Sequence, residues 1–391
     1  MHATAGPDRL PVFRALMWLA AIVVALFLVL PSPSLAQSSV RPPDNAVSTS
    51  APDAVGGNPP GGALGNTSDS DLWRGVKAGM TGNITIPDSK AATLIQAGGE
   101  DWRSLRNGSL YDYFGLAIVG TLLLLSLFFA LRGRIRVEKG LSGVLIPRFS
   151  GLERMAHWLM ALSFIILAIS GLNISFGREL VMPIIGKDLF GPMSAFLKLS
   201  HNYVAFAFML GLAIAFVTWV IHNVPNRHDI VWLAKAGGLL SKHSHPPAKK
   251  FNAGQKLIFW SVMLCGLSLC ISGWALLYPF HYTFFSDTFT ALKGIGIDIP
   301  ALTGLPDTPY APIMEQQLNT IWHAAMAVFL ICVILAHIYI GSIGMEGAFD
   351  AMGSGEVDLN WAREHHSLWV EEMTSEGTSQ RPRPYRGQAA E

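Results

Sequence analysis

Four histidines lie inside long apolar stretches of the chain: His157, His201, His323 and His337. Ionisable groups are costly within a membrane, so each of the four is a candidate functional residue. A neutral imidazole binds metal ions through one ring nitrogen while the other nitrogen makes a hydrogen bond. The residue type and the apolar setting therefore point first to metal or haem ligation inside a bilayer.

The spacing of His323 and His337 places them fourteen residues apart, which is two heptads. On one α-helix they would face nearly the same way, with a drift of about 40°, and stand about 21 Å apart along the axis. That helix offers one ligand at each of two depths. The sequence predicts an outer pair, His201 with His323, and an inner pair, His157 with His337. This arrangement suits two bis-histidine b-type haems in a helix bundle.

A plainer interpretation applies to each histidine taken alone, because one intramembrane histidine is often a hydrogen-bonded packing residue. Small neighbours such as Ala156, Ala324 and Ala336 fit the close approach of a flat macrocycle and ordinary helix packing equally well. Arg154, one turn before His157, could pair with a haem propionate or mark the membrane edge.

The three cysteines, Cys265, Cys270 and Cys332, all fall in apolar runs. The chain has no Cys-x-x-Cys-His motif, which excludes covalent attachment of a c-type haem. Three scattered thiols also provide no cluster for iron–sulfur or zinc. They are interpreted as small packing residues.

The elements that must position these histidines are transmembrane helices. Hydrophobic residues make up 51% of the 391-residue chain and charged residues only 14%, which excludes disorder and indicates an integral membrane protein. The net charge of +1 lacks the strong excess of basic residues that is typical of nucleic-acid-binding proteins. We predict an all-α membrane protein, a four-helix di-haem bundle plus one additional N-terminal transmembrane helix. The uncharged runs are Phe114–Leu131, Met155–Phe176, Leu199–Ile221, Leu257–Phe280 and Leu318–Met345.

The N-terminus has the pattern of a secretory signal, with Arg9 and Arg14 before an uncharged run and small residues before Gln37. We expect residues 1–36 to be a cleaved signal peptide; an uncleaved anchor would give the same topology. Residues 37–110 are expected to be a periplasmic linker rich in Pro, Gly and Ser. The remaining predicted divisions are a transmembrane helix at 111–132, a cytoplasmic loop at 133–152, the four-helix domain at 153–345 and a cytoplasmic tail at 346–391.

Lysine and arginine counts give the orientation. The loops 132–154 and 222–256 carry six Lys or Arg each, whereas the opposite loops carry three and one. Basic loops stay on the cytoplasmic side. The chain is therefore predicted to be multi-pass in the bacterial inner membrane, with its mature N-terminus in the periplasm and its C-terminus in the cytoplasm.

Several stretches between about 150 and 370 resemble one family, the gamma (cytochrome b) subunits of respiratory formate dehydrogenases, and the N-terminal region resembles their long form with a signal and an extra span. The stretches that carry the resemblance are Glu153-Arg-Met-Ala-His-Trp158, His222-Asn-Val-Pro-Asn-Arg-His-Asp229, Phe251-Asn-Ala-Gly-Gln-Lys256, Trp322-His-Ala-Ala325, Ala336-His-Ile-Tyr339 and Trp361-Ala-Arg-Glu-His-His366.

The resemblance implies that His157, His201, His323 and His337 are the axial ligands of two haem b groups. It also implies that Asn252, Gly254 and Gln255 form a quinone-binding turn at the start of the fourth span. The same Asn-Ala-Gly-Gln segment also has the residue types that favour a helix N-cap, and the two roles are compatible.

The function that the resemblance implies is electron transfer from an iron–sulfur subunit, through two b-type haems, to quinone. The chain carries no molybdenum, iron–sulfur or nicotinamide motif, so we expect it to be an electron-transfer subunit of an oxidoreductase complex and not the subunit that oxidises formate. The implied partners are the iron–sulfur subunit, a molybdenum or tungsten catalytic subunit, quinone and membrane lipid.

Three other functions stay open at this level. The chain could be the cytochrome b subunit of a nickel–iron hydrogenase or thiosulfate reductase, which share the four-helix, two-haem plan. It could be a metal or proton transporter that uses intramembrane histidines, although such proteins favour carboxylates or broken helices in their spans. A purely structural anchor would leave the four-histidine pattern unexplained.

Overall fold

The computed structural model describes residues 81–83, 93–95, 99–239, 244–375 and 383–384. The predicted signal peptide, residues 1–36, and most of the predicted linker at 37–110 lie outside the described residues. The chain divides into two compact units, Met1–Tyr113 with Phe280–Leu318, and Phe114–Pro279 with Asn319–Glu391. The second unit holds all seven predicted site residues and is described first.

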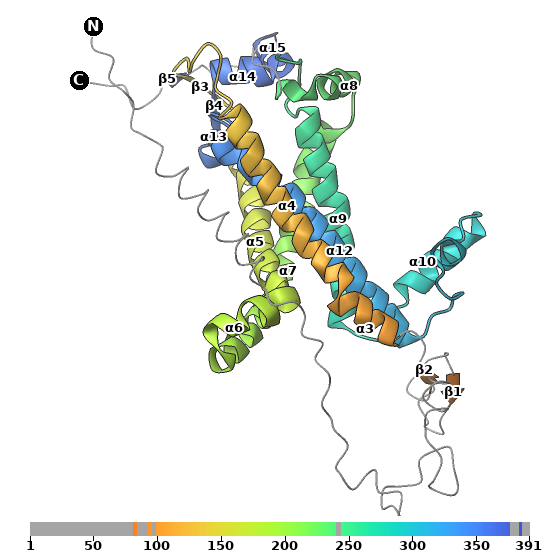
Figure 1. The fold of residues 1–391 in the computed structure, drawn as a ribbon. Helices are drawn as coiled ribbons and strands as arrows, with labels where there is room; N and C mark the ends of the chain where they lie inside the picture. The colour runs from red at the N-terminus through yellow and green to blue at the C-terminus, as the bar shows by residue number, and fades with distance from the viewer. Residues whose placement is uncertain (1–80, 84–92, 96–98, 240–243, 376–382, 385–391) are drawn as a thin grey trace, which may run out of the picture. The chain divides into compact units, whose positions relative to one another are not determined.

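Five helices in the described part of the chain are long and apolar enough to cross a membrane (Figure 1). These spans are Trp102–Arg132, Gly151–Leu180, Lys187–Asn223, Ala253–Leu277 and Pro312–Gly344. Each overlaps one of the five uncharged runs, so the prediction of a helical membrane protein is confirmed. The third helix begins twelve residues before its uncharged run, since Lys187, Asp188 and Lys198 lie in its first turns.

Individual elements of the second unit follow in chain order: most of α4 (Ser109–Arg132), β3 (Val144–Pro147), α5 (Gly151–Leu180), α6 (Met182–Ile185), α7 (Lys187–Trp219), α8 (Arg227–Ala234), α9 (Ala253–Leu277), most of α12 (Pro312–Tyr339), α13 (Asp350–Gly353), β4 (Glu356–Asp358), α14 (Leu359–His365), α15 (Ser367–Ser375) and β5 (Arg383–Pro384). A 3₁₀ turn, Val220–Asn223, extends α7, and a π turn, Ile340–Gly344, follows α12 three residues after His337.

Reciprocal side-chain caps start two of the spans. The Ser150 hydroxyl accepts from the Glu153 backbone N–H, and the Glu153 carboxylate accepts from the Ser150 N–H. Asn252 and Gln255 make the same exchange at the start of α9. Each capping box satisfies two backbone donors that have no partner within the helix, which fixes the residue at which the span begins.

Three spans pack closely through small residues. A Cβ on Gly211 of α7 would lie 2.8 Å from the backbone nitrogen of Met160 in α5. A Cβ on Gly266 of α9 would lie 3.1 Å from Leu212 of α7. Small residues let helix backbones approach where lipid provides no hydrophobic driving force.

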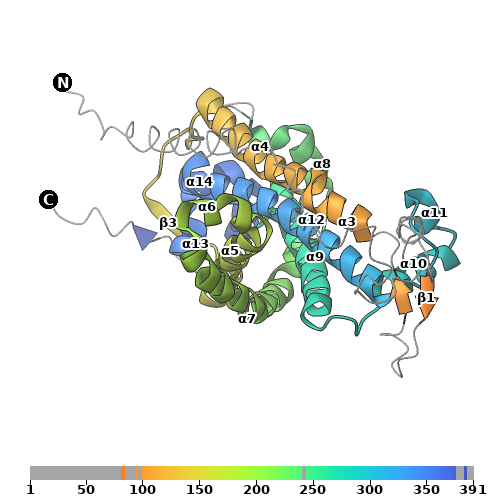
Figure 2. The same cartoon turned by 60° about the horizontal axis from the view of Figure 1, so that its bottom comes forward.

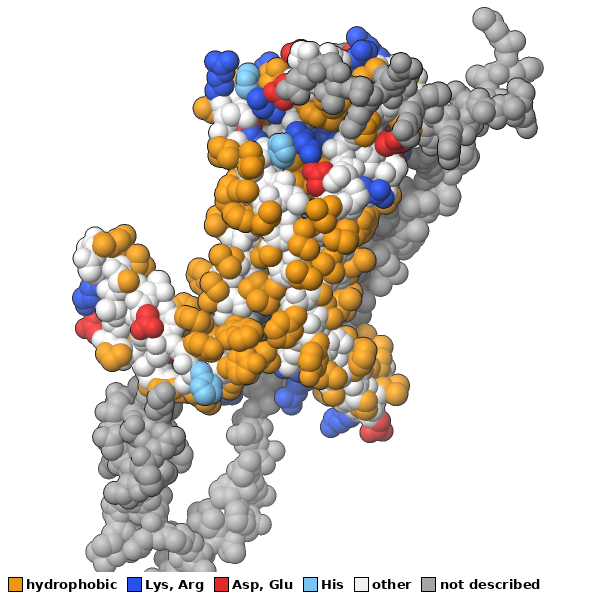
Figure 3. Space-filling model, turned by 180° about the vertical axis from the view of Figure 1, so that it is seen from behind, with side chains coloured by type: hydrophobic (Ala, Val, Ile, Leu, Met, Phe, Trp, Pro, Cys, Tyr) orange, Lys and Arg blue, Asp and Glu red, His pale blue; other side chains and the backbone are white. Residues whose placement is uncertain are grey.

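The α4 helix lies alongside α12 in both views of the ribbon (Figures 1 and 2). Phe128 and Phe129 of α4 meet Tyr339 edge to face, each with ring centres 6.2 Å apart. Lipid-facing side chains are apolar: Leu124 is 68% exposed and Val217 is 74% exposed. Figure 3 shows hydrophobic side chains over the middle of the bundle and charged ones at both ends, including the end that carries α8 and α14. This is the surface that a bilayer requires.

A small antiparallel sheet joins the segment before α5 to the C-terminal tail. Its strand order is β4-β3-β5, with Ile146 opposite Val357 and Leu145 opposite Arg383. The all-helical prediction did not include this sheet. The strands β3, β4 and β5 gather with α13, α14 and α15 at the inner-pair end of the bundle (Figure 1).

The first unit contains a two-stranded antiparallel sheet, β1 (Thr81–Asn83) with β2 (Thr93–Ile95), and the helices α3 (Gly99–Asn107), α10 (Phe284–Gly294) and α11 (Ile299–Thr303). The buried carboxylate of Glu315, in the first turn of α12, accepts from the backbone N–H groups of Phe285 and Ser286. A negative charge at a helix N-terminus is stabilising, so this contact fixes the start of α10.

Candidate functional site

The outer pair lies between α7 and α12. The ring centres of His201 and His323 are 6.3 Å apart, with an interplanar angle of 66°. A histidine nitrogen lies about 2 Å from a first-row metal ion, and the ring centre about 1.1 Å farther, so two imidazoles opposed on one ion have centres about 6.2 Å apart. The spacing of the outer pair therefore fits a single metal ion between the two rings.

Each imidazole of the outer pair is held by a serine on a neighbouring span. Nδ1 of His201 lies 2.8 Å from the Ser170 hydroxyl of α5, and Nδ1 of His323 lies 2.9 Å from the Ser272 hydroxyl of α9. Both hydroxyls donate to carbonyl oxygens one turn earlier in their own helices, so each accepts from the imidazole N–H. This assigns the proton to Nδ1 and leaves the lone pair on Nε2, the nitrogen available to a metal.

A glycine follows each of these serines and makes room for the imidazole. A Cβ on Gly171 would lie 3.4 Å from Cε1 of His201, and one on Gly273 would lie 3.3 Å from Cε1 of His323. The tripeptide Ile-Ser-Gly thus occurs at Ile169–Gly171 and again at Ile271–Gly273. The sequence interpretation missed these residues, and the repeated tripeptide was the signal that could have revealed them.

The inner pair lies between α5 and α12. The ring centres of His157 and His337 are 6.1 Å apart, with an interplanar angle of 62°. Trp158 and Trp219 flank His157, with ring centres 5.3 and 6.5 Å away. Nδ1 of His157 is buried and has no hydrogen-bond partner in the described part of the chain. The spacing of the inner pair again fits a single metal ion, but in the described part of the chain no serine accepts a hydrogen bond from Nδ1 of His157.

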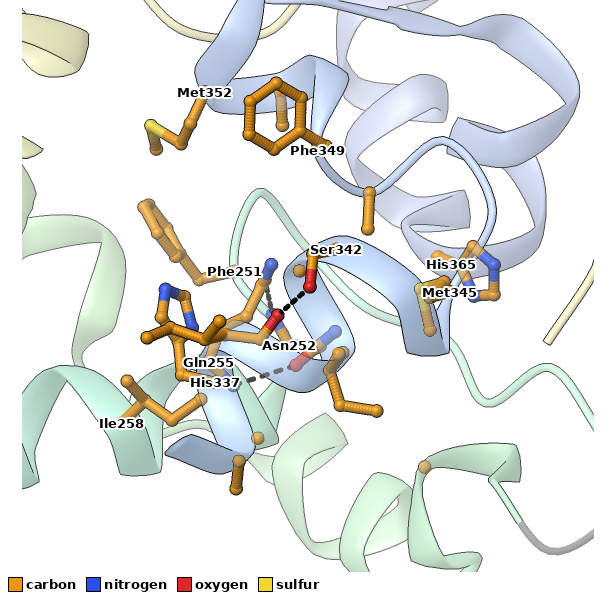
Figure 4. A pocket seen from close by; sticks show the side chains of 18 of the residues that line it. Phe251, Asn252, Gln255, Ile258, His337, Ser342, Met345, Phe349, Met352 and His365 are labelled. Atoms are coloured by element: carbon orange, nitrogen blue, oxygen red, sulfur yellow. Dashed lines mark hydrogen bonds between the residues drawn. The ribbon is translucent and has the colours of Figure 1, made fainter. Parts of the chain in front are cut away.

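A cavity of about 1150 Å³ opens beside the inner pair. Sites for small molecules usually enclose about 300–1,000 Å³, so this cavity has room for more than one such group. Its wall is mostly apolar, with a few polar side chains turned into it (Figure 4). Among the residues that line it are His157, His337, Trp219, Phe251, Asn252, Gly254, Gln255, Ile258, Ser342, Met345, Phe349, Met352, Trp361 and His365.

The three predicted quinone-site residues, Asn252, Gly254 and Gln255, all line this cavity. Figure 4 shows Asn252 and Gln255 beside His337. The capping box occupies the side-chain oxygens of Asn252 and Gln255. Within the described residues their amide NH₂ groups have no partner, so two donors are available to an acceptor oxygen in the cavity. A Cβ on Gly254 would lie 2.7 Å from the Trp232 ring, so glycine is needed here for that ring to pack on the turn.

The C-terminal tail forms one wall of the same cavity, which the sequence interpretation did not anticipate. Trp361, His365 and His366 line it, and all three belong to the Trp-Ala-Arg-Glu-His-His stretch that carried part of the family resemblance. The motif was the available signal. Its place in the site depended on the pairing of β3 with β4, which brings the tail over the end of the bundle.

A buried arginine anchors this tail. Arg148 donates to the Lys250 carbonyl and to Nε2 of His366, whose Nδ1–H donates to the Lys249 carbonyl. The guanidinium also lies 5.0 Å from the Trp369 ring centre. Burial lowers the pKa of Arg148 to about 9, although the nearby Glu153 carboxylate opposes this shift.

The tail histidines are neutral for the same reason. Burial, with Arg148 nearby, lowers the pKa of His366 well below its usual value. Burial, together with His245 and Arg148, lowers the pKa of His365 to about 4. Both side chains are therefore uncharged at pH 7 and can act as hydrogen-bond donors and acceptors.

Arg154 has partners other than a cavity ligand. Its guanidinium donates to the carbonyl oxygens of Met352 and Gly353, at the end of α13. Of the two roles considered from the sequence, pairing with a propionate or marking the membrane edge, these contacts support neither directly. They give Arg154 a third role, which is to cap a helix C-terminus.

The donor set fits a haem better than a bare metal ion. Among the described residues no group of three or more His, Cys, Asp or Glu side chains could hold an ion. Haem iron needs only two protein ligands, because the macrocycle supplies the others, and neutral imidazoles in apolar surroundings suit it. The three cysteines are free thiols inside spans, in keeping with their interpretation as packing residues.

Comparison with known proteins identifies the fold of this region. The model of the family described as prokaryotic cytochrome b561 matches residues 148–355, more than half of the chain. The cytochrome b556(Fdn) subunit of the nitrate-inducible formate dehydrogenase of Escherichia coli K12 is 27% identical over 59% of this chain and 92% of its own length. The cytochrome b556(fdo) subunit of a second formate dehydrogenase from that strain is 28% identical over 58% and 93%. A formate dehydrogenase cytochrome b556 subunit of Haemophilus influenzae is 26% identical over 56% and 79%. The predicted family resemblance is confirmed.

Proposed function

Because the chain belongs to the prokaryotic cytochrome b561 family, we propose that it is a membrane electron carrier that binds two haem b groups, one at each histidine pair. Haem iron held by two imidazoles takes up and releases one electron at a time. The observation that carries this proposal is the two imidazole pairs that share α12, with ring centres 6.1 and 6.3 Å apart. The two histidine pairs lie at different depths, and the spacing of each pair fits one metal ion, as two electron carriers in series would require.

The chain's own contribution at the outer pair is to fix the ligands. Ser170 and Ser272 accept from the Nδ1–H of His201 and His323, so each Nε2 keeps the lone pair that would bind the iron. Such supporting hydrogen bonds fix ring orientation and raise ligand basicity.

At the inner end we propose a quinone site in the cavity beside His337. A quinone offers two carbonyl oxygens that accept hydrogen bonds, and the free amide groups of Asn252 and Gln255 are donors that lie at the cavity wall. Gly254 lets Trp232 pack against the turn that carries both amides. Apolar side chains such as Ile258 and Phe349 line the same cavity and suit a hydrophobic ring and tail.

The physiological role proposed for the chain is that of its relatives, the cytochrome b subunits of formate dehydrogenases. It would receive electrons from an iron–sulfur subunit at the outer-pair end and deliver them to quinone at the inner-pair end. Formate oxidation itself would belong to a partner catalytic subunit that contains molybdenum or tungsten. Purification of the tagged chain with its partners tests this, since co-purified nickel would instead support the hydrogenase alternative.

The proposed placement is the bacterial inner membrane, with residues 1–36 removed as a signal peptide and residues 37–110 in the periplasm. The loop 133–152 and the tail 346–391 would face the cytoplasm, and residues 153–345 would form the di-haem domain. The basic loops at the inner-pair end support this orientation, because Lys and Arg are retained on the cytoplasmic side.

An optical spectrum tests the central proposal most directly. The purified full-length chain should show b-type haem bands after dithionite reduction, and pyridine haemochrome quantification should give two haems per chain. A colourless protein would overturn the proposal and favour a histidine-based transporter.

A further inference from the structure

Three titratable side chains lie in sequence along one wall of the cavity: Glu138, His245 and His365. The Glu138 carboxylate lies 2.8 Å from Nε2 of His245. The ring centres of His245 and His365 are 6.5 Å apart in an edge-on arrangement. A hydrogen bond thus joins the first two groups, and a ring contact joins the second to the third. One water molecule between the two rings would complete a path for protons.

Exposure to solvent falls along this path. The side chains of Glu138 and His245 are 42% and 31% exposed. Nε2 of His365 is buried and has no hydrogen-bond partner in the described part of the chain. His365 lines the same cavity as Asn252, Gln255 and His337 (Figure 4). One end of the path is thus exposed to solvent, whereas the other is buried in the cavity wall.

We propose that Glu138, His245 and His365 are a proton inlet that supplies the quinone site from the water phase at the inner-pair end. This inference rests on the proposed function, because it assumes that a quinone is reduced in the cavity. It assigns the three residues as proton-relay groups that need not touch the quinone themselves.

The chemistry requires such a supply. Reduction of one quinone to its quinol takes two electrons, which the haem held by His157 and His337 would supply, and two protons, which form two new O–H bonds. Each proton that leaves His365 for the cavity is replaced from His245 and Glu138, and finally from water. The relay residues are unchanged after each transfer.

The other charged or titratable groups near His365 make hydrogen bonds that do not belong to this path. Arg148 is a permanent donor to the Lys250 carbonyl and to His366. The two ring nitrogens of His366 bond a guanidinium and a backbone carbonyl, and neither of these partners is a proton-relay group. The Glu364 carboxylate accepts from the backbone N–H groups of Glu138 and Lys139, and so positions the first residue of the inlet.

The test uses the full-length chain purified with its partners, reduced with dithionite and mixed with a short-tailed ubiquinone analogue. The variants are E138Q, H245Q and H365Q, with H222Q as the matched control, because His222 is an exposed histidine that does not line the cavity. Haem content and reduced spectrum are measured first, then the rate of haem reoxidation in H₂O and in D₂O.

We expect unchanged haem content in all variants and a reoxidation rate at least about tenfold lower in H365Q, with a larger solvent isotope effect. E138Q and H245Q should be slowed less, and added imidazole should restore part of the lost rate in H245Q. Wild-type rates and isotope effects in both E138Q and H245Q would overturn the inlet whatever H365Q shows. Failure of the parent complex to be reoxidised by the quinone would instead count against the proposed function.

Discussion

The two ends of the bundle hold their histidine pairs in different ways. At the outer pair, serines from two other spans accept from both imidazoles, and glycines next to those serines let the rings approach. At the inner pair, Nδ1 of His157 has no such partner within the described residues, and a cavity of about 1150 Å³ adjoins the rings. The outer end is built to fix a bound group, whereas the inner end leaves space for a second molecule.

Removing one ligand from each end should give the largest contrast. We expect H323A and H337A each to lose about half of the haem, because a haem held by one of its two ligands is no longer retained. Pyridine haemochrome quantification per chain measures this. The haem that remains in H323A should still be reoxidised by added quinone after dithionite reduction, whereas that in H337A should not.

The matched control for these variants is H281A, which changes an exposed histidine outside the spans. Full haem content with normal turnover in H337A would show that the inner pair does not bind haem. Equal quinone reoxidation in H323A and H337A would remove the functional difference between the two ends.

The serine support should account for the next largest effect. The double variant S170A/S272A removes the serine acceptor from each imidazole N–H, and loss of such supporting contacts usually weakens metal-site affinity about 10- to 100-fold. Haem loss to apomyoglobin, followed separately at the two sites by their reduced spectra, should accelerate only for the outer haem.

Ser163 provides a close control for that experiment. It lies buried on α5 like Ser170, and its hydroxyl donates to carbonyl oxygens one turn earlier, but it contacts neither histidine pair. S163A should leave both haems in place. Equal acceleration in S163A and S170A/S272A would mean that the serines stabilise the helix rather than the ligands.

A smaller effect is expected at the cavity. Q255A removes one amide donor and one half of the capping box, and a single hydrogen bond is worth about 0.5–1.5 kcal/mol. We expect both haems to remain and the apparent affinity for quinone to fall roughly three- to tenfold. Quinone titration of the reoxidation rate measures this, with Q316A, which changes a glutamine outside the cavity, as the control. An unchanged affinity would place the quinone elsewhere.

The sequence predicted the spans and the pairing of histidines by depth, because apolar runs and a fourteen-residue spacing depend only on helix geometry. It also predicted the Asn252 cap. It did not predict that Ser170 and Ser272 support the histidines. A serine in a span usually bonds only to its own helix, and the side chain that it meets on another helix depends on how the helices pack. The tail's place at the cavity was likewise hidden, because it depends on β3 pairing with a strand more than two hundred residues away.

The least pronounced difference between the ends is a pH dependence confined to the inner one. His365 and His366 are held neutral in the docked tail, with the pKa of His365 lowered to about 4, whereas an undocked histidine titrates near 6.5. Docking of the tail should therefore be fully stable above pH 6.5 and weaken as the pH falls from 6.5 toward 4. The loss per histidine is at most about 1.4 kcal/mol for each pH unit in that range.

Peptide-resolved hydrogen exchange of residues 356–375, corrected for intrinsic rates, should show falling protection between pH 7 and 5. A peptide from α7 should stay constant, and H365Q/H366Q should remove the trend. Protection that stays flat in the parent chain would mean that the tail is held by packing of Trp361 and Trp369 alone.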